Sequence, residues 1–259
     1  MRCPRPRDTE FPMTLLILYL LYALVLSVAL GRAGHRSRRV VPETKSRDRP
    51  KRVLIIGASG GTGRELVAEA LERGYQVTAF VRHPAGVTVE HPHLTVVRGD
   101  VLDAASLDAA VPGHEAVVSA LGHNRYFYPT RILSEGTRNI LHAMARHGVP
   151  RFVCETSLGI GDSAGRLGLY YTLFTIPVIL PFYYWDKTRQ ERIIESSTAE
   201  WVIVRPGLLT NGPKRGGYRY GSDVGSFLGT VRISRADVAD FMLDQLESDA
   251  CLGAAPGVA

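Results

Sequence analysis

Several residue types that define common protein classes are scarce in this chain. It has only three cysteines in 259 residues, and Cys3, Cys154 and Cys251 form no C-x-x-C pair. A disulfide framework or a structural zinc site is therefore not expected. The eight histidines show no metal-ligand spacing, and His91 and His93 flank a proline in a predicted loop. We expect no metal site.

The sequence also does not predict a folded domain with a basic net charge. The net charge is +6, but the first 52 residues hold 12 of the 31 Lys and Arg and only 4 of the 25 Asp and Glu. The rest of the chain is slightly acidic, which argues against a nucleic-acid-binding face. The composition is 45% hydrophobic and 22% charged, and the length suits one α/β domain with an extension.

One long hydrophobic run lies near the start of the chain. Residues 13–30 carry no charge over 18 positions, about 27 Å as a helix and close to the thickness of a bilayer core. One interpretation is a signal peptide cleaved near Ala29-x-Gly31, which would lead to secretion. The other is an uncleaved anchor. The basic residues of 31–51 favour the anchor, because positive charge beside a span stays in the cytoplasm.

We therefore expect three segments before the domain. They are a polar amino terminus over 1–12, a transmembrane anchor over 13–30, and a disordered basic linker over 31–51. A linker of this charge is also suited to resting on anionic lipid. The domain itself is expected in the cytoplasm, with the membrane as its partner.

The most informative stretch is 53–63, VLIIGASGGTG. Four apolar residues run into a glycine-rich turn, and 64–73 then shows the apolar periodicity of a helix. A strand, a glycine turn and a helix in this order are typical of dinucleotide binding, whereas the turn alone is weak evidence. Gly57 permits the sharp turn, Gly60 lets a pyrophosphate approach the backbone, and Gly63 lets the helix lie close to the strand.

Further predicted strands alternate with predicted helices along the chain. This alternation predicts an α/β fold with a doubly wound parallel sheet over 52–250, whose strands end at one ligand-binding edge. After Pro206 the pattern loosens into a loop over 208–217. A tail is expected over 251–259, frayed over 253–259. The predicted strands are 76–81, 94–98, 115–121, 151–155, 201–204 and 229–233, and the predicted helices are 103–111, 130–147, 187–197 and 235–246.

The second strand does not end in the acidic residue that holds the ribose of NAD. Val81-Arg82-His83 stands there instead. A guanidinium pairs well with a 2′-phosphate, so Arg82 predicts NADP(H) rather than NAD(H), the alternative being an ordinary surface arginine. Asp100 follows the third strand and is predicted either to accept from an adenine amino group or to cap the helix over 103–111.

Three residues could form a proton relay at the same edge. Ser157 follows the fifth strand, and Tyr183 and Lys187 are spaced i, i+4. In such a relay Lys187 lowers the phenol pKa and holds the ribose, Tyr183 supplies a proton, and Ser157 orients a carbonyl. Pro181 leaves the helix start open, so Tyr183 could simply pack. Glu191 is expected to be an exposed helical partner of Lys187.

The segment 167–185 has no charge and contains two prolines, so it is not expected to span a membrane as a helix. Three interpretations remain open. The first is an apolar wall or lid over the substrate, which makes 158–185 a substrate loop and implies a flat apolar substrate. The second is a membrane-facing loop near the anchor. The third is ordinary packing inside the domain.

With these motifs in hand, the chain resembles an atypical short-chain dehydrogenase/reductase. It is most similar to the NAD(P)H-binding branch that contains flavin reductase/biliverdin reductase B and the NmrA-like proteins, although a membrane span is unusual there. The resemblance covers about 52–250. The stretches that carry it are 57–63 (GASGGTG), 80–82 (FVR), 99–102 (GDVL), 134–140 (SEGTRNI), Thr156-Ser157, 186–191 (DKTRQE) and 201–207 (WVIVRPG).

The resemblance implies a Rossmann fold and hydride transfer from NADPH to a flavin, quinone or carbonyl compound. It implies Arg82 at the 2′-phosphate and Ser157 and Lys187 beside the nicotinamide. Members differ in using a Tyr–Lys pair, and some only sense the cofactor. Alternatives are thus a non-catalytic sensor or scaffold, or a nucleotide-sugar epimerase/dehydratase. The predicted cofactor contacts are Gly57, Ser59, Gly60, Gly61, Thr62, Gly63, Arg82, Asp100, Val101, Leu121, Gly122 and Lys187, and the predicted catalytic residues are Ser157, Tyr183 and Lys187.

Overall fold

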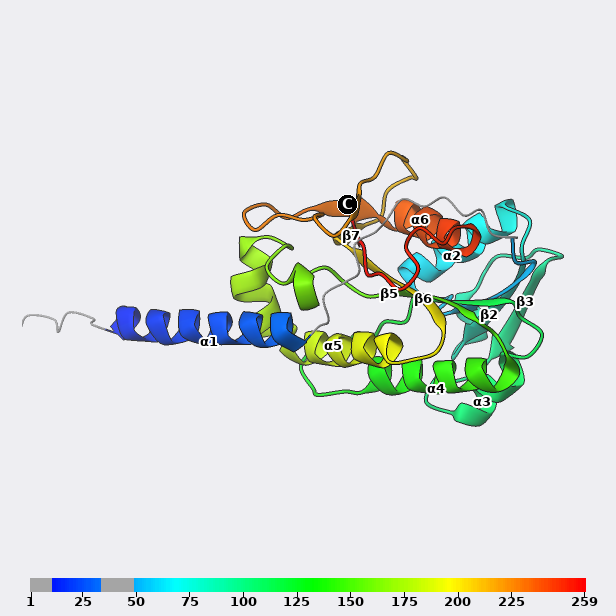
Figure 1. Cartoon of the computed structure of the whole chain (residues 1–259), viewed down its shortest axis with the longest axis horizontal. Helices are drawn as coiled ribbons and strands as arrows, with labels where there is room; N and C mark the ends of the chain where they lie inside the picture. Colours follow the sequence, from blue (N-terminus) through cyan, green and yellow to red (C-terminus); the bar gives the residue numbers. More distant parts are fainter. Residues whose placement is uncertain (1–10, 34–48) are drawn as a thin grey trace, which may run out of the picture.

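The computed structural model describes residues 11–33 and 49–259 (Figure 1). Most of the predicted polar amino terminus and of the predicted disordered linker lies outside the described residues. A long helix, α1, projects from one end of an α/β domain (Figure 1).

The domain is built on a doubly wound sheet. Six parallel strands lie in the order β3-β2-β1-β4-β5-β6, which confirms the predicted Rossmann fold. The strand order reverses between β1 and β4, and ligands bind in open α/β sheets at such a switch point. The strands are β1 (Arg52–Ile56), β2 (Gln76–Val81), β3 (Leu94–Arg98), β4 (Ala116–Ser119), β5 (Arg151–Glu155) and β6 (Glu200–Pro206).

Helices cover both faces of this sheet (Figure 1). Alternate strand residues point to opposite faces, so Val53 and Ile55 pack with α2 and α6 while Leu54 and Ile56 pack with α3 and α4. Because both faces are buried, the strands need the continuous apolar runs that the sequence shows. The helices of the domain are α2 (Gly61–Glu72), α3 (Ala104–Ala110), α4 (Ile132–His147), α5 (Pro181–Glu195) and α6 (Arg235–Glu247).

The carboxyl-terminal part is more regular than predicted. The expectation that the tail is frayed over 253–259 is wrong, because β10 (Gly257–Val258) pairs in parallel with β6 and Val258 is fully buried. β8 (Tyr220–Gly221) pairs with β10, and the predicted loop 208–217 begins with β7 (Leu208–Thr210), which pairs with β9 (Arg232–Ser234). These strands of two or three residues are too short to show an alternating pattern.

The segment between β5 and α5 is also ordered. It contains the short helix η2 (Gly161–Ser163) and the π-helix η3 (Tyr171–Ile179), and another short helix, η1 (Pro84–Gly86), follows β2. The helix α1 (Phe11–Ala33) lies against η2 and η3, where Leu30 is buried with Leu158, Ile160 and Tyr184. The stretch Leu15–Arg32 of α1 is long and apolar enough to cross a membrane, by length and composition alone.

A buried ion pair holds α5 on the sheet. The prediction of an exposed Glu191 is wrong, because its side chain is fully buried and accepts from Arg205 Nη2 at 2.7 Å and Nε at 3.0 Å. Thr156 donates to the same carboxylate at 2.6 Å, and Arg205 also pairs with Asp162. This face of α5 is turned to β5 and β6, so the network fixes the helix that carries Lys187.

Replacing Glu191 by Gln should lower the free energy of unfolding by about 3 kcal/mol, because the buried Arg205 guanidinium would lose its fully buried partner charge and keep only Asp162. Urea unfolding of the full chain, followed by circular dichroism, measures this. Glu72→Gln at the exposed end of α2 is the control and should change stability by less than about 0.5 kcal/mol. Equal stability of the two variants would show that the ion pair does not hold α5.

Candidate functional site

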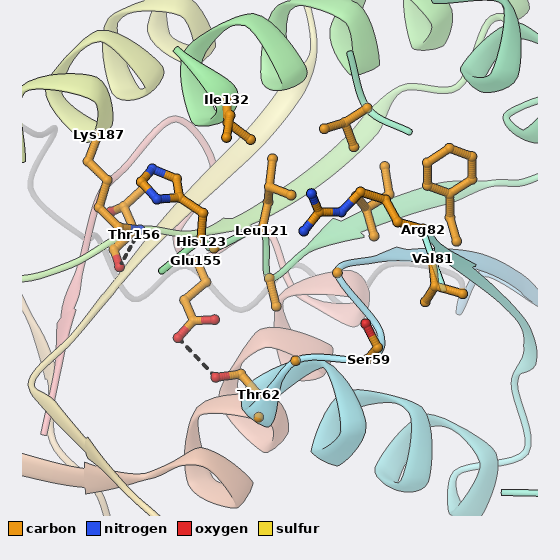
Figure 2. Close-up of a pocket in the computed structure, with 18 of the residues that line it drawn as sticks. Ser59, Thr62, Val81, Arg82, Leu121, His123, Ile132, Glu155, Thr156 and Lys187 are labelled. Atoms are coloured by element: carbon orange, nitrogen blue, oxygen red, sulfur yellow. Dashed lines mark hydrogen bonds between the residues drawn. The ribbon is translucent and has the colours of Figure 1, made fainter. Parts of the chain in front are cut away.

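A cleft of about 630 Å³ opens at the carboxyl ends of the strands, over the switch point between β1 and β4. Figure 2 shows residues from the glycine turn, β2, β5 and α5 converging on it. All but two of the predicted site residues line this cleft. They are Gly57, Ser59, Gly60, Gly61, Thr62, Arg82, Asp100, Val101, Leu121, Gly122, Tyr183 and Lys187.

The glycine turn has the geometry that the spacing predicts. Gly57 has φ +80°, and a Cβ there would lie 2.5 Å from the Ala120 carbonyl oxygen. The Gly60 amide donates to the Gly57 carbonyl at 2.9 Å, which closes the turn. Gly63 is buried behind it and does not line the cleft, but a Cβ there would lie 2.1 Å from the Gly57 oxygen. The turn and α2 are therefore in direct contact.

The start of α2 faces the cleft. Gly60 is its N-cap and offers no side-chain acceptor, and Gly60, Gly61 and Thr62 line the cleft. The first amides of a helix need partners from outside it, and the helix dipole adds positive potential there. This end of α2 is thus suited to an anionic group such as a diphosphate.

Arg82 stands at the end of β2 with an exposed side chain. Figure 2 shows its guanidinium directed across the cleft toward Leu121. Asp100 also lines the cleft, and its Oδ1 accepts from the Leu102 amide at 3.0 Å. The alternative that Asp100 caps the next helix is wrong, since Asp103 caps α3 by accepting from the Ala105 amide at 3.1 Å.

Tyr183 and Lys187 share one helix, because Pro181 occupies the first turn of α5 and does not interrupt it. The Lys187 Nζ lies 5.2 Å from the centroid of the Tyr183 ring and donates to the Thr156 carbonyl at 3.1 Å. The Tyr183 ring meets the rings of His123 and Tyr126 edge to face, at centroid distances of 4.9 and 5.6 Å. These rings form an aromatic wall at one end of the cleft.

Two ionisable side chains, Lys187 and Glu155, are buried beside this wall. Burial lowers the pKa of Lys187, but Tyr183, Glu155, Cys154 and Glu191 together outweigh it and raise the pKa above its ordinary value. Burial raises the pKa of Glu155, and Lys187 and Thr62 oppose that shift. The Thr62 hydroxyl donates to Glu155 at 3.1 Å (Figure 2). The arrangement keeps Lys187 cationic within the cleft.

Ser157 lies elsewhere than the predicted relay requires. It does not line the cleft, and its hydroxyl lies 3.0 Å from the Tyr184 hydroxyl and donates to the Leu158 carbonyl. Thr156 lines the cleft instead, although its own hydroxyl is committed to Glu191. Neighbouring residues at a strand end point to opposite sides, so an offset of one position moves the side chain out of the site.

Sequence reasoning missed several residues of the cleft. Glu155 is the last residue of β5, and its place at the carboxyl edge was a usable signal. His123 lies in a loop without a pattern, and it accepts from the Arg125 amide at Nδ1 while Nε2 meets the Thr130 hydroxyl at 3.0 Å. Burial lowers the pKa of His123, which favours a neutral ring that donates from Nε2.

The predicted substrate loop 158–185 contributes one residue, Tyr183, to the cleft lining. Two of its helices, η2 and η3, pack against α1. The apolar composition of a lid and that of a helix-packing surface are the same, so the sequence could not separate them.

Residues 57–249 match the sequence model of the NAD(P)H-binding family. This chain belongs to the NAD(P)H-binding family. The match confirms the resemblance to short-chain dehydrogenases/reductases and makes the chain a member of an oxidoreductase family that binds NAD(P)H.

Three similar proteins illustrate the family. An uncharacterized chloroplastic protein of Arabidopsis thaliana is 31% identical over 187 residues, 67% of this chain and 65% of that protein. ChuY, an anaerobillin reductase of Escherichia coli O157:H7, is 25% identical, with a TM-score of 0.65 over 80% of this chain and 96% of that chain. A Veillonella parvula short-chain dehydrogenase/reductase in complex with NADP is 20% identical, with a TM-score of 0.68 over 81% and 94%.

The chain spans less than two thirds of the length of the Arabidopsis protein, and about a third of the length of the curated dehydrogenases that it matches over 117 residues.

Replacing Gly57 by Ala in this NAD(P)H-binding protein should weaken NADPH binding more than tenfold and lower its thermal stability. The Cβ would strain a positive φ and collide with Ala120, which displaces the turn. Gly74→Ala is the matched control, because Gly74 has φ +79° and nothing within 4 Å of a Cβ. It should cost about 1 kcal/mol and leave binding unchanged.

Fluorescence titration with NADPH and thermal unfolding measure both effects. If Gly57→Ala and Gly74→Ala behaved alike in the titration, the turn would not hold the cofactor.

Proposed function

We propose that this protein is an NADPH-dependent oxidoreductase that transfers hydride to a flat apolar acceptor such as a flavin, a quinone or a conjugated carbonyl compound. The observation that carries the proposal is the exposed Arg82 at the end of β2, directed into a cleft that begins at the glycine turn. A guanidinium in this position suits a 2′-phosphate, and the turn suits a diphosphate.

The residues present fit a dinucleotide along the whole cleft. The amides at the start of α2 would hold the diphosphate, Arg82 the 2′-phosphate, and Asp100 an amino group of the base. Arg82 has no ion pair among the described residues that would compete. The NADP in the Veillonella structure supports the same choice of cofactor.

The other end of the cleft supports a flat acceptor. Tyr183, Tyr126 and His123 present rings there, and flat apolar molecules bind well against such surfaces. The likeness to an anaerobillin reductase supports a reductase acting on a conjugated molecule.

The bound cofactor would supply the hydride. Tyr183 would donate a proton from its hydroxyl to the reduced acceptor, and Lys187 would hold a positive charge beside it. His123 would keep the Tyr183 ring in place through their edge-to-face contact. Ser157 takes no part in this step, because its hydroxyl lies outside the cleft at 3.0 Å from the Tyr184 hydroxyl.

The turned-away Ser157 also favours a second candidate, a protein that senses NADPH without turnover. The two proposals agree on binding and differ only in chemistry, so an acceptor screen with the bound cofactor separates them.

We propose further that α1 anchors the protein in a membrane with the domain in the cytoplasm. Its apolar length and the basic residues over 31–51 support this orientation. The alternative is a cleaved signal, and the chloroplastic Arabidopsis relative is consistent with a targeting segment. The amino-terminal sequence of the mature protein decides between them.

Arg82→Ala should weaken NADPH binding by about 10- to 100-fold, which is the effect of losing one charge-assisted bidentate contact, and should change NADH binding little. Fluorescence titration with each nucleotide measures this. Arg98→Ala is the control, because Arg98 is exposed at the end of the neighbouring β3 and does not line the cleft. An equal loss of affinity for NADPH and NADH would show that Arg82 does not bind the 2′-phosphate.

Tyr183→Phe should lower kcat by about 100-fold or more while NADPH binding persists, because only the donated proton is lost. Lys187→Met should lower kcat as well, since it removes the cation with little change in volume. Steady-state oxidation of NADPH with quinone and flavin acceptors measures both. Tyr128→Phe, at an exposed tyrosine outside the cleft, should behave as the wild type. Binding without turnover in the wild type itself would favour the sensor.

A further inference from the structure

An apolar stripe runs along η3 and the first turns of α5. It consists of five exposed side chains, Tyr170, Phe174, Val178, Phe182 and Trp185, with exposed fractions of 60%, 43%, 47%, 42% and 58%. The Tyr170 and Phe174 rings lie 5.5 Å apart, and Phe182 and Trp185 are three residues apart on α5, so the members of each pair are neighbours on the surface. Single exposed apolar residues are ordinary, but a contiguous series of this length marks an interaction surface.

The apolar stripe adjoins the helix that leaves the domain. The Tyr22 hydroxyl of α1 donates to the Pro177 carbonyl of η3 at 3.2 Å, and the Tyr19 hydroxyl donates to the Leu173 carbonyl. In Figure 1, α1 projects from one end of the domain, and η3 (lime green) lies beside its base at that end. The outer surface of α1 is apolar as well, with Leu18 56% exposed and Leu21 51% exposed.

A second exposed apolar group lies at the same end of the domain. The loop around residue 225 (orange in Figure 1) reaches the end from which α1 projects, and it carries Leu228, which is 80% exposed. Leu167, just before the stripe, forms a bridge with Ser226 of this loop. Three separate parts of the chain at this end of the domain thus carry exposed apolar side chains.

We propose that the apolar stripe inserts into the bilayer that holds α1, so that the domain docks on the membrane through two elements. The proposal rests on the proposed anchor. The partner that covers the apolar stripe is lipid, because the stripe continues the apolar surface of α1 and is rich in aromatic rings, which favour the membrane interface.

The first turn of α5 links this docking surface to the cleft. Tyr183 lines the cleft, its neighbour Phe182 belongs to the stripe, and Tyr184 packs with Leu30 of α1. Docking therefore places the aromatic wall within one helix diameter, about 10 Å, of the lipid. An acceptor dissolved in the membrane would reach Tyr183 from that side.

The two tryptophans of the chain make a direct test possible. Trp185 lies in the stripe, whereas Trp201 of β6 is half-buried against the sheet core. The full chain is placed in nanodiscs of phosphatidylcholine and phosphatidylglycerol, with or without bromine on the upper acyl chain. We expect brominated lipid to quench the emission, and Trp185→Phe to abolish most of that quenching.

Quenching that is the same in the wild type and in Trp185→Phe would overturn the proposal. A stripe exposed to water would instead be quenched by acrylamide. A second copy of the chain over the stripe would shield Trp185 from both quenchers and give a cross-linked dimer. Either of these results excludes docking on lipid.

A charged side chain in the stripe tests the docking proposal without changing any residue that lines the cleft. Val178→Glu should reduce the bromine quenching of Trp185 severalfold, because a carboxylate is expelled from the interface. Val89→Glu is the matched control, since Val89 is 45% exposed in a loop outside the stripe, and should quench as the wild type. Unchanged quenching in Val178→Glu would contradict the proposal.

NADPH titration of the same samples keeps the two proposals separate. If Trp185 does not meet lipid but the nucleotide still binds in an Arg82-dependent way, docking fails and the proposed function stands. If Trp185 contacts lipid and no nucleotide binds, the docking proposal stands and the proposed function fails.

Discussion

The contact between α2 and the glycine turn is the constraint on which the rest of the site depends. A Cβ on Gly63 would lie 2.1 Å from the Gly57 oxygen, so the helix can begin here only without a side chain at this point. The contact brings the free amides of α2 to the carboxyl end of β1, at the switch point of the sheet. Arg82 from β2 and Lys187 from α5 then reach the same cleft from either side.

The second constraint lies behind α5. Glu191 lies one turn beyond Lys187 on this helix and is hydrogen-bonded to Arg205 and Thr156 inside the domain, while Tyr183 and Lys187 line the cleft. A helix held by a buried ion pair gives its cleft-lining residues a fixed position. A loop of the same sequence would not hold Tyr183 against two other rings. Such rigidity is what proton transfer at a defined atom requires.

The fold and most of the cleft could be predicted because their signals are local. The run before Gly57, the glycine spacing and the arginine after the second strand each depend on a few neighbouring residues, and the structure brings them together. Ser157 was misplaced because the side on which a residue lies changes at every position along a strand, and no local signal sets the offset.

Other features could not be predicted for different physical reasons. In the sequence, Glu191 resembles a surface residue. Its partner Arg205 belongs to β6, which contacts α5 only once the chain is folded. The strand β10 is held by backbone hydrogen bonds, which leave no trace in side-chain pattern. The segment 167–185 is apolar, and that property alone does not distinguish a lid, a packed helix and a lipid-facing surface.

The buried pair of Glu191 and Arg205 also bears on how this family can diverge. Loss of either side chain alone strands the other charge in the interior, whereas replacing both by apolar side chains of similar volume is often neutral. A single substitution at either position is therefore destabilising. We expect relatives that inherit this pair either to retain both residues or to replace both together.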